Sequence, residues 1–292
     1  MKITEAFERG EFVVTAEVGP PKGCHIEHVL EEAKAYLSGI TAVNVTDNQS
    51  SVMRLGSLAT CKALKDEGLT PIYQLTCRDR NRIALQSDLL SAAMLGIENL
   101  LLLTGDHTKM GDHPQAKPVF DLDSVSLIHT VNKLEEGEDL GGNKLIGEPP
   151  KFAKGAVVSP CSDSVDAQLA KMERKVAAGC DYFQTQAVFE PEKFIKFMEK
   201  AKQFGKPVQV GIIIPKSAGM AKFMNNNVAG IHVPDDMIEE LKKDKEKTKA
   251  GITGVEIAAR IIKECKPYCQ GVHIMALGWE SKVPDLLKVA GI

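Results

Sequence analysis

The sequence predicts an α/β fold, a single-domain (β/α)8 or TIM barrel that spans residues 1–292. Three observations predict this fold class. Short runs rich in β-branched residues or leucine alternate eight times with longer segments of helical period. Glycine stands where several of the helices would end before the next strand. Polar residues follow the expected strands, at the end where parallel barrels carry their functional groups.

The expected strands are short apolar runs bounded by turn residues. The first run ends at Glu17, because the Pro20-Pro21 pair that follows cannot continue a hydrogen-bonded ladder. A carboxylate is therefore expected at the rim of the barrel. The eight runs are 12–17, 42–46, 71–75, 99–103, 156–158, 182–186, 208–213 and 272–275.

The expected helices show a buried face at intervals of three and four residues. Leu169, Met172 and Val176 form such a face in one helix, with charged residues between them. Lys175 belongs to the same helix and neighbours Arg174, so the charge pattern alone predicts a solvated lysine. The helices are expected at 29–37, 55–67, 82–95, 124–134, 165–178, 192–204 and 254–264.

Two segments exceed a minimal βα repeat. Residues near 135–150 contain four glycines and a proline pair, which predicts a long surface excursion. Residues near 234–249 are so heavily charged that a helix there would be mostly solvated. Neither segment has the composition of a linker, so one domain is expected.

Composition narrows the class of protein. A chain of 292 residues that is 43% hydrophobic can bury a substantial core, and its net charge of -3 gives no basic footprint for nucleic acid. Apolar runs such as 100–103 and 210–214 are too short to cross a membrane, and the N-terminus lacks a signal-peptide core. Seven scattered cysteines, an odd number, indicate the reduced thiols of a cytoplasmic protein.

No sequence motif indicates a metal site or a Rossmann-type nucleotide site. The spacing of Cys265 and Cys269 is only a weak metal signal, so no metal is expected, and G-x-G-x-x-G, P-loop and G-x-S-x-G motifs are absent. Instead, the polar strand ends would form a ring around a ligand with many hydrogen-bonding groups. This ring comprises Glu17 and residues 46–48, 74–79, 104–107, 159–160, 185–186, 215–217 and 276–280.

Several motifs of the chain resemble methylenetetrahydrofolate reductase in its short, single-domain prokaryotic form. They are AEVGPP at 16–21, QLTC at 74–77, LTGD at 103–106, RKVAAG at 174–179 with TQ at 185–186, and HIMA at 273–276 with GWE at 278–280. The likeness covers nearly the whole chain in the right order. It implies a flavoprotein oxidoreductase of one-carbon metabolism and methionine biosynthesis, which reduces 5,10-methylenetetrahydrofolate to 5-methyltetrahydrofolate.

The resemblance implies roles for three residues in catalysis and substrate binding. Glu17 would be the general acid that protonates N10 as the folate ring opens to a 5-iminium ion. Such a role typically contributes about 10² to 10⁴ in rate and requires partial burial of the acid. Reduced flavin N5 would deliver hydride to the iminium carbon. Asp106 would lie near both flavin and pterin, and Gln186 would hydrogen-bond the pterin.

The resemblance also implies a set of flavin-binding positions, in which two residues depart from the better-known bacterial pattern. Gln74 stands where histidine is common, and Thr104 where arginine is common. FAD is the cofactor that the family implies by default. The missing guanidinium would have bound the diphosphate of FAD, so its absence leaves FMN open as well. The electron donor would be NADH, NADPH or a partner protein. The positions are Thr46, Gln74, Thr104, Gly105, Asp106, Phe120 and Lys175.

Two other functions stay open from the sequence. A folate-binding barrel methyltransferase that acts with a corrinoid would bind the pterin without a flavin. A flavoprotein subunit of a larger electron-transfer complex would be the third class, and a homo-oligomer is the other expected assembly. Taken alone, Glu17 could cap a turn, Asp106 could cap the next helix, and Trp279 could pack the barrel mouth or contact a ligand.

Overall fold

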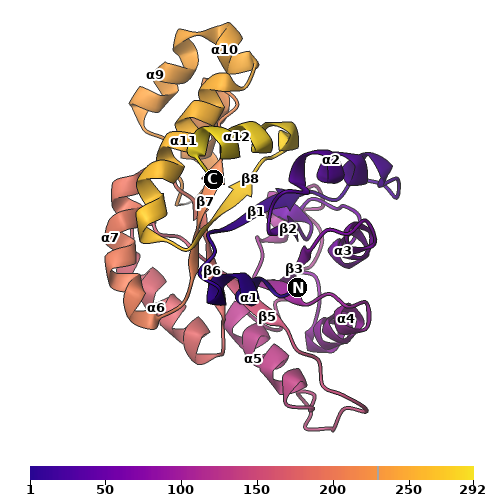
Figure 1. The fold of residues 1–292 in the computed structure, drawn as a ribbon. Coiled ribbons are helices and arrows are strands. Elements are labelled where there is room, and N and C mark those ends of the chain that lie inside the picture. The colour runs from indigo at the N-terminus through magenta and orange to yellow at the C-terminus, as the bar shows by residue number, and fades with distance from the viewer. Residues whose placement is uncertain (229) are drawn as a thin grey trace.

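The computed structural model describes residues 1–228 and 230–292, in which eight parallel strands close into a barrel in sequence order (Figure 1). Each strand pairs with the next, and β8 pairs with β1. The predicted (β/α)8 barrel is confirmed. The strands are β1 (Val13–Val18), β2 (Ala42–Val45), β3 (Pro71–Thr76), β4 (Asn99–Leu103), β5 (Ala153–Val158), β6 (Tyr182–Ala187), β7 (Val208–Ile213) and β8 (Gly271–Met275).

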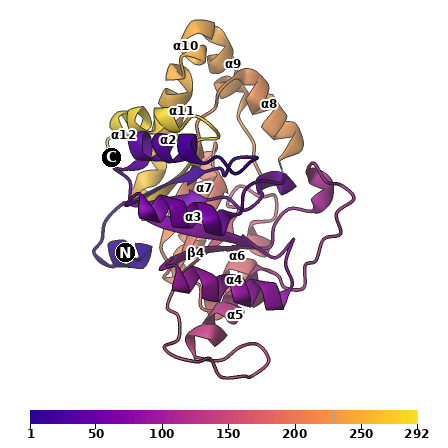
Figure 2. The same ribbon diagram turned by 90° about the vertical axis from the view of Figure 1, so that its right-hand side faces the viewer.

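Helices surround the barrel, and those expected from the sequence are present (Figures 1 and 2). The main helices are α1 (Ile3–Glu8), α2 (Glu27–Leu37), α3 (Ser57–Asp66), α4 (Arg82–Met94), α5 (Ser124–Glu135), α6 (Val165–Ala177), α7 (Pro191–Ala201), α8 (Ala218–Asn227), α9 (Asp235–Lys243), α10 (Lys245–Lys249), α11 (Ile252–Cys265) and α12 (Val283–Ala290). Short 3-10 turns are η1 (Gln49–Ser51), η2 (Thr108–Met110), η3 (Lys202–Phe204), η4 (Lys266–Tyr268) and η5 (Glu280–Lys282).

The charged segment 234–249 is not the single helix that the sequence predicted. It forms α9 and α10, which are separated at Asp244. The backbone of Asp244 is extended, and its carboxylate accepts a hydrogen bond from the N–H of Lys247. This residue therefore caps the second helix and interrupts the first, because an N-cap has non-helical backbone angles.

Helix α1, which the sequence analysis did not assign, packs at the amino-terminal end of the barrel. Ile3 and Ala6 are fully buried and cluster with the first residues of several strands, including Val13 and Ile72. The backbone N–H of Ile3 also donates to Asn99 Oδ1 at 2.7 Å. Because this end is filled by apolar side chains, a ligand can approach the barrel interior only from the carboxyl ends of the strands.

The described residues include no membrane-spanning helix, no disulfide and no metal-binding cluster of side chains. No helix among them is long and apolar enough to cross a membrane. All seven cysteines are free, as expected of reduced thiols, and only Cys24 is exposed. Within the described ranges, no group of three or more histidine, cysteine, aspartate or glutamate side chains is arranged to hold a metal ion.

The pairing of β6 with β7 is irregular near the carboxyl end of β6. The register shifts between Gln184 and Ala187, and Ala187 pairs with Gly211. Gly211 donates its N–H to Thr185 Oγ1 at 2.8 Å, and a Cβ at this glycine would lie 2.2 Å from the Thr185 carbonyl oxygen. The bulge therefore depends on a residue without a side chain at position 211.

We predict that Gly211→Ala lowers the free energy of unfolding by about 1 to 3 kcal/mol, because the new methyl group must displace backbone. Urea denaturation followed by circular dichroism measures this change. Gly23→Ala is the matched control, since no heavy atom lies within 4 Å of a Cβ there. Equal midpoints for the two variants would contradict the prediction.

Candidate active site

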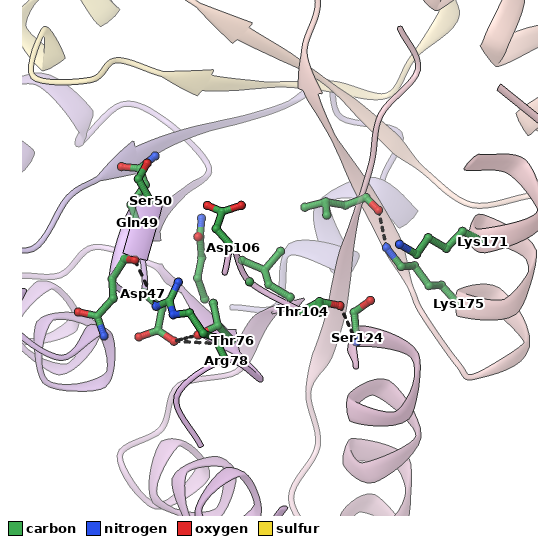
Figure 3. A pocket seen from close by; sticks show the side chains of 15 residues that line it. Asp47, Gln49, Ser50, Thr76, Arg78, Thr104, Asp106, Ser124, Lys171 and Lys175 are labelled. Carbon is green, nitrogen blue, oxygen red and sulfur yellow. Dashed lines mark hydrogen bonds between the residues drawn. The ribbon is translucent and has the colours of Figure 1, made fainter. Parts of the chain in front are cut away.

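A cavity of about 280 Å³ opens at the carboxyl ends of β2, β3 and β4 and reaches the inner side of α6 (Figure 3). Figure 3 shows Thr104 and Asp106 between a cluster around Asp47 and the two lysines of α6. The flavin positions implied by the resemblance largely meet here. Those that line the cavity are Gln74, Thr104, Gly105, Asp106 and Lys175.

Glu17 stands at the end of β1, beside this cavity. Its side chain is 12% exposed, which meets the partial burial expected of it. Its Oε1 lies 3.3 Å from Gln74 Nε2 and 3.4 Å from His273 Nε2. Its Oε2 accepts from Gln49 Nε2 at 3.4 Å. Because Gln74 and Gln49 both line the cavity, the carboxylate is one residue removed from the ligand space.

A buried aspartate joins the loops that follow β2 and β3. Asp47 Oδ2 accepts from the N–H of Thr76 at 3.0 Å, from its hydroxyl at 2.8 Å and from Arg80 Nη1 at 2.8 Å. Charge-assisted hydrogen bonds of this kind are roughly twice as strong as neutral ones. The wall of the cavity formed by these two loops is therefore held in place by one carboxylate.

Arg78 adds a cation to the cavity wall that the sequence analysis placed in the polar ring without a role. The residue is 2% exposed, pairs with Asp79 at 2.7 Å and donates from Nη2 to the Asn48 carbonyl at 3.3 Å. No pattern in the sequence predicts that Arg78 is buried. Buried arginines are rare and are often found where a planar, charged group is recognised. Arg78 lines the same cavity as Thr104.

Gly105 lets the chain pass close to the loop after β3. Its φ is +92°, and a Cβ there would lie 3.1 Å from Thr76 Cβ and 3.2 Å from Arg78 Cβ. Only glycine adopts this backbone without strain and leaves the cavity floor open. Thr104 Oγ1 accepts from the N–H of Ser124, which ties the floor to the start of α5, while Asp106 is exposed at the mouth.

Lys175 corrects the expectation of a solvated lysine. It is 4% exposed, and its Nζ donates to the Val157 carbonyl at 2.6 Å. Burial lowers the pKa of Lys175 to about 8. Helical periodicity explains this burial better than the charge pattern does. Lys175 follows Met172 by three residues and therefore lies on the same buried face of α6, whereas Lys171 is exposed.

Besides Glu17, three positions implied by the resemblance lie outside the cavity lining. Thr46 follows β2, and its buried hydroxyl has no hydrogen-bond partner among the described residues. Phe120 is half-buried at a φ of 42°, with its ring 6.3 Å from that of His107. Gln186 is the penultimate residue of β6, which lies across the barrel from β2, and its Oε1 accepts from the N–H of Ala187.

The cavity suits a planar ligand that carries an anionic group. Arg78, Lys171 and Lys175 supply cations on two of its walls, and the glycine floor admits a flat ring system. The fold and site together define a (β/α)8-barrel protein with a cation-lined cavity beside a partly buried carboxylate. Comparison with known proteins narrows this class. The chain belongs to the methylenetetrahydrofolate reductase family, whose family model matches residues 2–291.

Individual relatives agree with this assignment. "Methylenetetrahydrofolate reductase 2" of Schizosaccharomyces pombe is 28% identical over 252 residues, which cover 81% of this chain but only 38% of the yeast protein. "5,10-methylenetetrahydrofolate reductase" of Escherichia coli is 25% identical over 263 residues, which cover 87% of this chain and 82% of that protein. The present chain therefore spans less than half of the yeast relative and most of the bacterial one.

A solved structure shares the fold. An uncharacterised protein from Clostridium thermocellum, which binds two copies of 5-methyl-5,6,7,8-tetrahydrofolic acid, aligns over 99% of this chain and 98% of its own. The TM-score is 0.69 and the sequence identity is 15%. At this identity the likeness supports the barrel architecture alone.

We predict that Lys175→Met stabilises the protein at pH 7. The unfolded lysine has a pKa near 10.5 and the folded one about 8, so the buried ammonium costs up to about 3 kcal/mol below pH 8. Between pH 8 and 10.5 the unfolded chain binds the extra proton, and stability of the unmodified protein rises with pH. The gain from Lys175→Met should therefore shrink at pH 9.5.

Urea denaturation at pH 7 and pH 9.5 measures this difference. Lys196→Met is the matched control, since Lys196 is an exposed lysine of the neighbouring helix α7. A Lys175→Met variant that is less stable than the unmodified protein at pH 7 would contradict the prediction.

Proposed function

We propose that this chain catalyses the flavin-dependent reduction of 5,10-methylenetetrahydrofolate to 5-methyltetrahydrofolate, with Glu17 as the general acid. The observation that carries the proposal is the position of Glu17, a partly buried carboxylate whose partners Gln74 and Gln49 line the cavity. Family membership and the names of the relatives support the substrate.

The proposed role of Glu17 is to give a proton to N10 of the folate as the imidazolidine ring opens. Its Oε1 is held by Gln74 and faces His273, whereas within the described part of the chain Oε2 has one hydrogen-bond partner, Gln49 of the surface turn η1. Oε2 is therefore the oxygen that a substrate can reach by displacing one weak contact. A carboxylic acid held in this way adds typically about 10² to 10⁴ to the rate.

The cavity residues are proposed to hold the flavin, which supplies the hydride when it is bound. Lys175 and Arg78 would meet its phosphate, and Gly105 would lie against its ring. Asp106 at the mouth would face the cationic form of the folate, because a carboxylate stabilises positive charge that develops beside it. Gln186 would reach the pterin from the opposite side of the barrel.

The flavin type and electron donor belong to the same proposal. With Thr104 in place of arginine, Lys175 and Arg78 are the buried cations proposed to serve the phosphate, so FMN and FAD are both to be tried as ligands. NADH, NADPH or a partner protein would supply electrons to the flavin, and the chain would act as a homo-oligomer or as one subunit of an electron-transfer complex.

We expect the purified protein to bind a flavin whose reduced form is reoxidised by 5,10-methylenetetrahydrofolate under anaerobic conditions. Glu17→Gln should slow this reoxidation by about 10² to 10⁴, because the amide cannot give N10 a proton. Stopped-flow absorbance of the flavin band measures the rate. Glu31→Gln, at an exposed glutamate of α2, is the matched control and should leave the rate unchanged.

Two results would contradict this proposal in different ways. A protein that binds neither FMN nor FAD, yet binds methyltetrahydrofolate, would favour the corrinoid-dependent methyltransferase. A flavoprotein that Glu17→Gln leaves equally fast in reoxidation would remove Glu17 from the acid role while keeping the reductase.

We expect flavin affinity to fall as the pH rises through about 8, because Lys175 then loses the proton that attracts the phosphate. Lys175→Met should bind FMN about 10-fold more weakly or worse at pH 7, and its affinity should change little between pH 7 and pH 9. Quenching of flavin fluorescence measures both. Lys175→Met should thus be more stable than the unmodified protein and bind FMN more weakly. Equal FMN affinities of the two proteins at pH 7 would contradict a phosphate role for Lys175.

A further inference from the structure

A chain of buried polar side chains fills the middle of the barrel and leads to Glu17. Its members face inward from five different strands and are almost fully buried, and none belongs to the cavity lining. They are Thr15, Asn44, Gln184, Gln209 and His273. Burying polar side chains in a barrel interior costs free energy unless they are hydrogen-bonded, so a connected series of five of them indicates a specific role.

Backbone carbonyl groups set the direction of this chain. Gln209 Nε2 donates to the carbonyl oxygens of Val13 at 3.3 Å and Val272 at 3.1 Å, so its amide nitrogen faces them and its Oε1 faces the other way. That Oε1 accepts from Gln184 Nε2 at 3.0 Å. Gln184 in turn directs its Oε1 to Asn44 Nδ2 at 2.9 Å.

Thr15 stands between these amides and His273. Its Oγ1 lies 3.1 Å from the amide nitrogen of Gln209 and 3.3 Å from that of Gln184, so it can accept a hydrogen bond from either amide. Two acceptors are then within reach of the hydroxyl proton: His273 Nδ1 at 3.0 Å and the Val272 carbonyl at 3.5 Å. Nδ1 is the better acceptor, because the distance from a hydroxyl oxygen to its acceptor is usually about 3.0 Å or less.

We propose that His273 is a positioning residue for Glu17, held by Thr15 as the neutral tautomer with its proton on Nε2. That N–H points at Glu17 Oε1, 3.4 Å away, and the proposal rests on the acid role of Glu17 proposed above. When the proton leaves Oε2 for N10 of the folate, the carboxylate left behind is stabilised at Oε1 by N–H groups of His273 and Gln74. His273 keeps its own proton throughout.

The opposite tautomer would work against the site. With the proton on Nδ1, the Thr15 hydroxyl would lose its near acceptor and keep the Val272 carbonyl at 3.5 Å, and the lone pair of Nε2 would face the carboxylate oxygen. The buried side chains of the barrel interior therefore act on Glu17 by fixing the tautomer of His273. A hydrogen bond at one ring nitrogen of a histidine determines whether the other nitrogen carries the proton.

The first test reads the tautomer directly and needs neither flavin nor folate. Long-range ¹H–¹⁵N correlation spectra of histidine-labelled protein distinguish the two neutral tautomers and the imidazolium, and the His273 signal is identified by its loss in His273→Gln. We expect the Nε2–H tautomer in the unmodified protein and in Thr15→Ser, and a shift toward Nδ1–H in Thr15→Val. An Nδ1–H tautomer or an imidazolium in the unmodified protein would overturn the proposal.

The second test uses two amides of different length at position 273. Gln places an N–H close to the position of Nε2, whereas Asn reaches only as far as Nδ1 and leaves Glu17 without this donor. Loss of a hydrogen bond to a charged group predicts that His273→Asn slows reoxidation by methylenetetrahydrofolate about 10- to 100-fold. His273→Gln should recover most of this rate, and flavin reduction should not change in either variant.

The two tests separate this inference from the function on which it rests. Equal reoxidation rates in His273→Asn and His273→Gln, with both variants as stable as the unmodified protein in urea, would overturn the positioning role. A protein that shows the Nε2–H tautomer but never oxidises its flavin with folate would contradict the proposed function, while the tautomer set by Thr15 would stand.

Discussion

Closure of eight parallel strands is the constraint on which the rest of the structure depends. It brings all carboxyl ends to one rim, so Glu17 of β1 meets His273 of β8 although 256 positions separate them. The other end of the barrel is filled by α1 and the apolar residues around Ile3. The chemistry is therefore confined to one mouth, as in other barrels of this type.

The cavity shows how this molecule retains costly groups for binding. The buried ammonium of Lys175 has a lowered pKa because it has left water, and its charge is compensated by one carbonyl. Arg78 is likewise buried but is paired with Asp79. A buried cation that lowers the stability of the free protein is expected where an anionic ligand can later compensate it, which is why the flavin phosphate is proposed to lie at these two residues.

The barrel interior and the cavity are connected through hydrogen bonds rather than through apolar packing. Asp47 fixes the loops after β2 and β3, and Thr15 links the interior amides to His273. A polar network in which each member has a partner specifies one arrangement of its side chains, because any rotation leaves a buried donor or acceptor unpaired. Glu17 lies where the interior chain reaches the rim.

The sequence by itself determined the alternation of strands and helices, the end of β1 to within one residue and the family, because these follow from local period, turn residues and motif order. It left Lys175 open between a solvated helix face and the flavin site, merged α9 with α10 and gave no role to Arg78 or His273. These features depend on which side chains meet after barrel closure. Only the tertiary structure brings Glu17, Gln74 and His273 together, since no local pattern encodes a contact between β1, β3 and β8.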